Sequence, residues 1–255
     1  MDVMVFTPVY RLEEQTVQAL MALEGGPVTL VLQRDNPRRS DDARRDGWDN
    51  HLHQYQRGYE LFMAGRFDAM LVIESDIIPP PDTLARLAAL PADVAYGAYV
   101  FRQGPGNVVN VLNRYYPWPQ QARNMGESLT VRGLWGAAME QGVIDCSGSG
   151  LGCVLIRRHV LEQAPFLAAP AGGFFDWHWT QTIYAQGWRM MADCNLHCGH
   201  VTPDGRVLWP AGRDEKGIGG LGDCREKSGF DADEKTDFPN LENRTSQIGK
   251  TGLRE

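Results

Sequence analysis

The sequence predicts an α/β fold in which a mostly parallel central sheet is flanked by helices. Two observations support this prediction: short, continuously apolar runs alternate with helical patterns through the first hundred residues, and the runs end in polar residues. Apolar strands separated by helices are typical of a parallel sheet that is covered on both faces. In such sheets, ligands bind beyond the carboxyl ends of the strands. We therefore expect the functional site where the first three strands end.

The predicted elements follow in order from the N-terminus. We expect strands at residues 3–6, 28–33 and 69–74, which read VMVF, VTLVLQ and AMLVIE. Apolar residues recur at helical spacing in the two intervening segments: Val17, Leu20 and Met21 in the first, and Tyr55, Tyr59, Phe62 and Met63 in the second. The polar segment 34–50, RDNPRRSDDARRDGWDN, is expected to be a loop.

Beyond residue 91 the pattern predicts a smaller sheet region. Shorter strands are expected at 94–101, 108–112 and 152–157, followed by a helix at 177–185 and a strand in WRMMA. The chain from residue 213 is polar and rich in glycine, with little apolar periodicity. We expect a single domain over residues 1–212 and a polar lid or tail over 213–255.

Composition excludes several classes of function. The net charge of −7 argues against general nucleic-acid binding, which needs clustered positive charge. No apolar run approaches the ~18–20 residues of a membrane span, and the N-terminus enters a strand-like run without a signal-peptide pattern. The odd number of cysteines, five, fits a reducing compartment. We expect a cytoplasmic protein.

Glu74 ends the third predicted strand, Asp76 follows two residues later, and three prolines come soon after. Side chains at positions i and i+2 of an extended strand point to the same side, so the two carboxylates are expected to share one hard cation. Mg²⁺ and Mn²⁺ take oxygen ligands and let substrate phosphates complete their coordination. The alternative is a pair of solvated loop carboxylates.

The strand, the acid-x-acid sequence and IIPPP together resemble the GT-A glycosyltransferases that use nucleotide sugars, in particular the family 2 enzymes. The resemblance implies that residues 1–100 bind the nucleotide and that residues 101–212 bind the acceptor. It also implies Asp76 as the more direct ligand of Mn²⁺ or Mg²⁺, with Glu74 as a further ligand or facing the sugar or ribose. The other donor-binding positions that it implies are Thr7, Pro8, Asp35 and Ser75.

The resemblance extends into the second half of the chain. Asp176 and Gly187 match the spacing at which family 2 enzymes open and close a helix, which implies that Asp176 is the catalytic base of an inverting reaction; a simple helix cap is the alternative. SGSGLGCVLIRRHVLEQ resembles the acceptor half, which implies that Gly150 and Gly152 lie near the sugar; a plain tight turn explains these glycines equally well. Trp177 is a candidate for stacking on the acceptor, or equally a core residue.

His200 lies where many GT-A enzymes place a histidine that completes the metal site. A different interpretation assigns the cluster of Cys194, His197, Cys198, His200 and Cys224 to zinc. In the polar segment that follows, Arg213 and Lys216 are expected to contact the donor diphosphate as part of a mobile lid.

The sequence therefore predicts a metal-dependent glycosyltransferase that moves a sugar from a nucleoside-diphosphate sugar, with UDP-sugars as the first expectation, to an unknown acceptor. The main alternative is a non-catalytic module of the same fold that binds a nucleotide sugar or a protein, with or without structural zinc. A nucleotidyltransferase is disfavoured because TPVYRLEEQ lacks the glycine of its first-loop signature.

Overall fold

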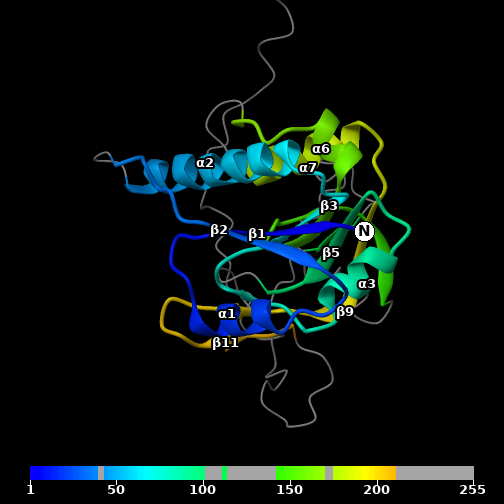
Figure 1. The fold of residues 1–255 in the computed structure, drawn as a ribbon, viewed down its shortest axis with the longest axis horizontal. Coiled ribbons are helices and arrows are strands. Elements are labelled where there is room, and N and C mark those ends of the chain that lie inside the picture. The colour runs from blue at the N-terminus through cyan, green and yellow to red at the C-terminus, as the bar shows by residue number, and fades with distance from the viewer. Residues whose placement is uncertain (40–42, 101–110, 114–141, 170–174, 211–255) are drawn as a thin grey trace, which may run out of the picture. The chain divides into compact units, whose positions relative to one another are not determined.

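A computed structural model describes residues 1–39, 43–100, 111–113, 142–169 and 175–210. Its centre is an eight-stranded sheet in the order β2-β1-β3-β8-β5-β9-β7-β6 (Figure 1). In chain order these strands are β1 (Val3–Pro8), β2 (Val28–Gln33), β3 (Ala69–Ile73), β5 (Val94–Ala98), β6 (Val111–Asn113), β7 (Val143–Ser149), β8 (Cys153–Arg157) and β9 (Met190–His197).

Most strands of this sheet point in one direction. β1 pairs in parallel with both β2 and β3, and β5 pairs in parallel with β9. β8 lies antiparallel between β3 and β5, and β7 lies antiparallel between β9 and β6. Only β7 and β8 therefore run against the other six strands of the described sheet, and the prediction of an α/β fold with a mostly parallel sheet is confirmed.

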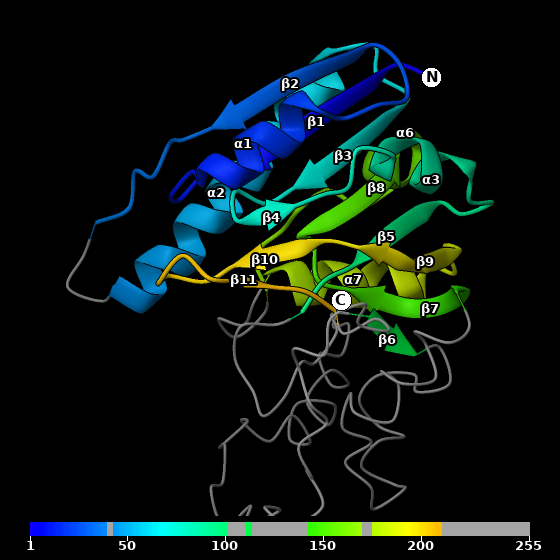
Figure 2. The same ribbon diagram turned by 90° about the horizontal axis from the view of Figure 1, so that it is seen from below.

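Helices cover both faces of the sheet. On one face lie α2 (Ala43–Ala64), α6 (Arg158–Gln163) and α7 (Phe175–Ala185), which contribute Tyr55, Phe62, Val160 and Trp179 to one apolar core. On the other face lie α1 (Glu14–Met21) and α3 (Thr83–Ala89), with Leu20, Leu84 and Leu87 in a second core (Figures 1 and 2). The buried, continuously apolar sequences of β1 and β3 follow from this two-sided cover.

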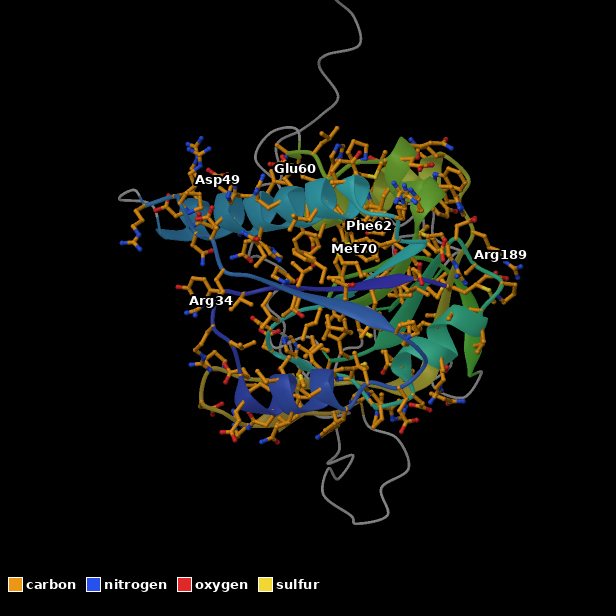
Figure 3. All side chains as sticks on the ribbon, in the orientation of Figure 1. Arg34, Asp49, Glu60, Phe62, Met70 and Arg189 are labelled. Carbon is orange, nitrogen blue, oxygen red and sulfur yellow. The ribbon has the colours of Figure 1, made fainter. Side chains whose placement is uncertain are left out.

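The contact between α2 and β1 is close. A Cβ atom on Gly58 would lie 2.5 Å from Cε2 of Phe6, so glycine is needed where the helix crosses this ring. Phe62 and Met70 point into the layer between α2 and the sheet, whereas Asp49 and Glu60 project away from it (Figure 3). This packing fixes α2 over the carboxyl end of β1.

A separate three-stranded antiparallel sheet follows the acidic segment. Its order is β11-β10-β4, with β4 at Ile77–Ile78, β10 at Gly199–Val201 and β11 at Val207–Leu208. His200 faces Ile77 in the register, and the amide of Val201 donates to the carbonyl of Asp76 at 2.8 Å. A small second sheet is thus present, but the strands predicted for it at 94–101, 108–112 and 152–157 join the central sheet as β5, β6 and β8. The small sheet that forms instead brings the chain near residue 200 beside the acidic residues.

Two local predictions are wrong. The segment expected to be a loop at 34–50 becomes helical at Ala43, where α2 begins. The first turns of α2 are polar because their side chains line a cleft and face solvent instead of the core. Strand β2 has the apolar sequence of a buried strand, but it is an edge strand whose Val28, Leu30 and Leu32 are 39%, 37% and 42% exposed.

Three remaining sequence predictions concern membrane spans, domain limits and cellular location. Among the described residues, no helix is both long and apolar enough to cross a bilayer. Segments 101–110, 114–141 and 211–255 lie outside the described residues, and with them the boundary predicted at residue 213. The domain limits and the cytoplasmic location therefore stay predictions.

Candidate functional site

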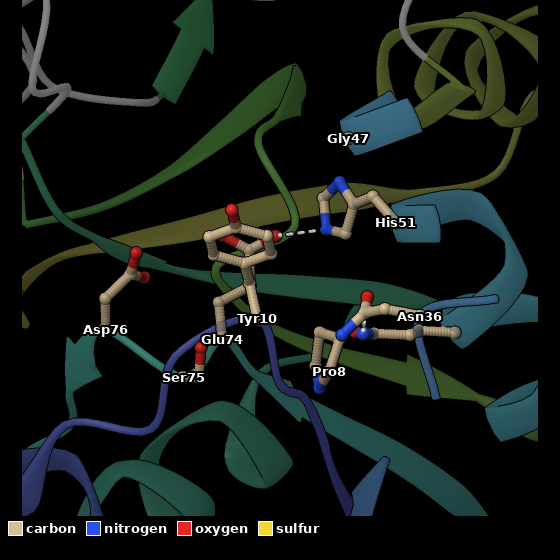
Figure 4. Close-up of a pocket in the computed structure, with 9 residues that line it drawn as sticks. Pro8, Tyr10, Asn36, Gly47, His51, Glu74, Ser75 and Asp76 are labelled. Atoms are coloured by element: carbon tan, nitrogen blue, oxygen red, sulfur yellow. Dashed lines mark hydrogen bonds and ion pairs between the residues drawn. The ribbon is translucent and has the colours of Figure 1, made fainter. Parts of the chain in front are cut away.

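A cleft of about 310 Å³ opens at the carboxyl ends of β1, β2 and β3 (Figure 4). This is the edge of the sheet at which the sequence predicts the site. Its lining combines residues that follow the three strands with residues from the first half of α2: Pro8, Tyr10, Asn36, Gly47, His51, Gln54, Glu74, Ser75 and Asp76. The described lining holds two carboxylates and no lysine or arginine, so an anionic ligand would need a cation here.

The acidic segment is a turn and not an extended strand. β3 ends at Ile73, and the amide of Ile77 donates to the carbonyl of Glu74 at 3.0 Å, which closes a turn over residues 74–77. The rule that side chains at i and i+2 share a face therefore does not apply. Glu74 reaches toward His51, whereas Asp76 lies on the other side of Glu74 from that histidine (Figure 4).

Glu74 is held by two donors from α2. His51 Nε2 donates to Glu74 Oε1 at 3.1 Å, and the Tyr55 hydroxyl donates to the same oxygen at 3.2 Å. Burial acts to raise the pKa of Glu74, but the hydrogen bond and charge of His51, the charge of His200 and the Tyr55 hydroxyl together lower it. Burial alone would lower the pKa of His51, yet the bond to Glu74 and the charges of Glu74 and Asp176 raise it. These opposite shifts of the two pKa values favour an ion pair between His51 and Glu74.

Asp76 faces His200 instead. His200 Nδ1 lies 2.6 Å from the carbonyl oxygen of Val100, which can only accept, so Nδ1 carries the hydrogen. Nε2 points toward Asp76 Oδ1, 3.7 Å away. In the neutral imidazole this nitrogen presents its lone pair to the carboxylate. A backbone carbonyl that fixes the ring through its other nitrogen is a common way of orienting a metal-ligating histidine.

These residues fit a metal site that is completed by substrate. Among the described residues, no three His, Cys, Asp or Glu side chains gather closely enough to hold a metal by themselves. Asp76 and His200 form a two-ligand set, and Mg²⁺ or Mn²⁺ bound through few protein ligands takes the rest of its shell from phosphates and water. The two hydrogen bonds to Glu74 turn this residue away from the pair, so that Asp76 and His200 are the better candidates for ligands.

Asp176 is brought to the same region from α7. It lies in the first turn of that helix, and its neighbour Trp177 donates its backbone N–H to Asp176 Oδ1 at 2.7 Å. The ring of Phe175 packs against that of His51 with centroids 5.1 Å apart. Burial raises the pKa of Asp176, His51 opposes this, and the charge of Glu74 adds to it. A half-buried carboxylate with a raised pKa suits a general base.

The helix that carries Asp176 ends as the sequence indicates. Gly187 adopts φ +82°, and its amide donates to the carbonyl of Tyr184 at 3.0 Å, which closes the C-terminus of α7. The spacing between Asp176 and Gly187 thus spans one helix. The catalytic role of Asp176 stays a prediction.

The residues expected to bind the nucleotide divide into two groups. Pro8, Ser75, Glu74 and Asp76 line the cleft. Thr7 is fully buried within β1 and does not line it. Asp35 pairs with His53 at 3.0 Å, and its neighbour Asn36 is the residue that reaches the cleft.

A network of amide side chains fixes the loop after β2. Asn50 accepts from the backbone N–H of Arg38 at 2.7 Å and donates to the carbonyl of the same residue at 3.0 Å. Gln54 donates to the carbonyl of Val9 at 3.0 Å and to Asn36 Oδ1 at 2.7 Å. The wall of the cleft is therefore preorganised by α2.

Sequence reasoning missed five residues of the lining: Tyr10, Asn36, Gly47, His51 and Gln54. The sequence could have indicated three of them. Gly47, His51 and Gln54 are spaced by four and three residues, which places them on one face of a helix.

Of the candidates on the acceptor side, Gly152 has a structural reason to be glycine. Gly152 donates its amide to the Tyr99 hydroxyl at 3.1 Å, and a Cβ there would lie 2.8 Å from Cζ of Tyr99. The missing side chain thus makes room for Tyr99. Gly150 joins β7 to β8 and is half-buried, and Trp177 is half-buried beside Asp176. Contact of these residues with an acceptor stays a prediction.

The cysteine and histidine cluster is not assembled within the described residues. Cys194 and Cys198 are buried, and burial raises the pKa of the Cys194 thiol to about 12. Neither thiol forms part of a group of three potential metal ligands among the described residues. Cys224, Arg213 and Lys216 lie outside the described residues, so the zinc alternative and the two cations of the lid stay predictions.

Comparison with solved structures supports the fold. The chain resembles A197 from STIV with a TM-score of 0.51 and 17% sequence identity, over 85% of this chain and 97% of that one. Weaker likenesses are to S. aureus TarS 1–349 in complex with UDP (TM-score 0.42, 11% identity, 75% of this chain and 57% of TarS) and with UDP-GlcNAc (0.44, 12%, 85% and 60%). At these scores the two TarS likenesses carry no argument about this chain. No protein-family model and no curated protein sequence matches it.

Proposed function

We propose that this protein is a metal-dependent glycosyltransferase that transfers a sugar from a nucleoside-diphosphate sugar to an acceptor hydroxyl with inversion. One observation carries the proposal: Glu74 and Asp76 line a cleft beyond the carboxyl ends of parallel strands, and two residues from other parts of the chain lie beside that lining. His200 Nε2 is 3.7 Å from Asp76 Oδ1, and Asp176 follows Phe175, whose ring packs against that of His51. The sequence resemblance to GT-A enzymes suggests sugar transfer from a nucleotide sugar as the reaction, and the α/β fold is compatible with this reaction.

Each residue has a role in this proposal. Asp76 and His200 would hold Mn²⁺ or Mg²⁺, which supplies positive charge to the departing diphosphate. No lysine or arginine lines the described cleft, and its histidine, His51, is paired with Glu74, so this charge is needed for donor binding. Pro8, Tyr10 and Asn36 would surround the nucleoside, and Tyr10, 84% exposed at the cleft, has a face on which a base can stack.

Asp176 would accept the proton of the acceptor hydroxyl as the new glycosidic bond forms. Its raised pKa makes it a stronger base than an ordinary aspartate once it is ionised. Direct attack of that hydroxyl, with the diphosphate leaving from the opposite side, inverts the anomeric centre.

The test is nucleotide release from a panel of UDP-, GDP-, ADP- and TDP-sugars, with Mn²⁺ or with chelator. The proposal expects turnover of at least one donor, with UDP-sugars first, and loss of that turnover in chelator. Turnover that is equal in chelator would contradict the metal assignment. Tight binding of a nucleotide sugar without transfer to water or to any acceptor would favour the non-catalytic module.

A further inference from the structure

We propose that His51 is a positioning residue, which holds the Glu74 carboxylate at the cleft and links it to the helix that carries Asp176. The expected kinetic effects rest on the proposed function. The positioning of Glu74 by His51 rests only on the contacts that α2 makes with the end of β3 and with α7.

The first step is the geometry around Glu74. Both donors, His51 Nε2 at 3.1 Å and the Tyr55 hydroxyl at 3.2 Å, reach the same oxygen, Oε1. Among the described residues, we find no donor to Oε2. Glu74 lines the cleft, so Oε2 is the oxygen that can accept a hydrogen bond from a hydroxyl group of a ligand.

The second step is the rigidity of the two donors. Tyr55 is fully buried, and its ring contacts Phe6, Phe166 and Phe175 with centroids 5.6, 5.1 and 4.9 Å away. The His51 ring packs edge-on against Tyr55 at 5.0 Å. Side chains that are locked by packing hold a functional group more accurately than flexible ones.

The third step is the link to α7. The His51 ring also packs edge-on against Phe175 at 5.1 Å, and Phe175 precedes Asp176 directly. Asp176 and Glu74 both act electrostatically on His51. The His51 imidazole therefore contacts both Glu74 and the residue before the proposed base, and its charge offsets the repulsion between the two carboxylates.

We therefore expect substitution of His51 to change kcat and to leave metal binding unchanged. Replacing His51 by leucine removes the N–H donor but keeps a similar volume, and we expect kcat to fall about tenfold to a hundredfold, as for loss of one hydrogen bond to a charged group. His51→Gln keeps an N–H at the position of Nε2 and should restore most of the rate. The Mn²⁺ concentration for half-maximal activity should stay unchanged in both variants.

The experiment combines kinetics with spectroscopy. It compares the wild type, His51→Leu, His51→Gln and Tyr55→Phe by kcat, donor KM, Mn²⁺ titration and thermal unfolding. His159→Leu is the matched control, because His159 also pairs with a carboxylate, Asp93 at 2.8 Å. This pair lies at the start of β5 and on α6, at the ends of the strands away from the cleft. Nitrogen-15 spectra of the histidine rings are recorded for the wild type and Glu74→Ala, and the proposal expects the His51 Nε2–H signal to shift in this variant.

Each outcome decides one claim. A folded His51→Leu variant with the kcat of the wild type overturns the positioning role, as does a His51→Gln variant no better than leucine. A raised Mn²⁺ requirement in His51→Leu would show instead that Glu74 is a metal ligand. If no donor is turned over by the wild type, the proposed function fails, and the spectra alone decide whether His51 holds Glu74: a His51 signal that is unchanged in Glu74→Ala overturns it.

Discussion

Replacing Asp176 by asparagine should change activity and stability in opposite directions. Asparagine has the same shape and can still accept the backbone N–H of Trp177, which lies 2.7 Å from Asp176 Oδ1. It cannot take up the proton of an acceptor. We expect kcat to fall about 10²- to 10⁴-fold, the usual contribution of a general base.

The stability effect follows from the pKa of Asp176. Burial, with the charge of Glu74, raises this pKa, so the folded protein binds the proton more tightly than the unfolded chain does. The stabilisation by the protonated form is complete below the unfolded pKa and is lost as the pH rises through the folded pKa. Each unit of pKa difference is worth about 1.4 kcal/mol. The asparagine side chain never ionises. The Asp176→Asn variant should therefore be more stable than the wild type at pH 8, by about 1.4 kcal/mol for each unit by which folding raises the pKa of Asp176. This difference should shrink toward pH 4.

The assay is urea unfolding of both proteins between pH 4 and 8, with kcat measured in parallel. The same change at Asp82, an exposed residue at the start of α3, is the control and should alter stability by less than about 0.5 kcal/mol. A variant that is less stable than the wild type at every pH would refute the idea of a destabilised carboxylate. Retained turnover would refute the role of Asp176 as base.

Three further predictions concern the walls of the cleft and its support. Tyr10→Ala should raise the donor KM about tenfold, because one base-stacking contact is lost, while urea unfolding stays unchanged because Tyr10 is exposed. Asn50→Ala removes two hydrogen bonds to the backbone of Arg38. It should lower the free energy of unfolding by about 1–3 kcal/mol and raise the donor KM. An unchanged KM would show that donor binding does not depend on these hydrogen bonds. Arg86→Leu leaves the buried Asp193 carboxylate, 2.7 Å from Arg86 Nη2, without its cation. It should lower the free energy of unfolding by about 1.5–3 kcal/mol, as for loss of a hydrogen bond to a charged group, without altering kcat; stability equal to the wild type would refute it.

The sequence was most informative where apolar residues define an element. The apolar runs locate β1 and β3, because burial on both faces leaves a continuously apolar strand, and the stripe of Tyr55, Phe62 and their neighbours locates the core face of α2. The spacing from Asp176 to Gly187 likewise corresponds to one helix. Strand β2 was misjudged because an edge strand with exposed leucines has the same composition as a buried one.

The cleft itself was harder to predict. Its wall is the polar first half of α2, and a helix whose polar side chains face a cleft resembles a loop in composition. The geometry of Glu74 and Asp76 depends on the turn closed by Ile77, and this turn depends on β4 pairing with β10, far along the chain. Such long-range pairing leaves no local signal, and it alone places His200 beside Asp76.

Isothermal titration calorimetry of UDP binding, with Mn²⁺ and with chelator, tests whether a metal holds the donor diphosphate at this cleft. We expect the wild type to bind UDP only with Mn²⁺, because the described cleft has two carboxylates and no lysine or arginine. We also expect Asp76→Ala and His200→Ala to lose this binding while remaining folded. UDP binding of equal strength in chelator, or in both variants, would contradict the metal and diphosphate site at this cleft.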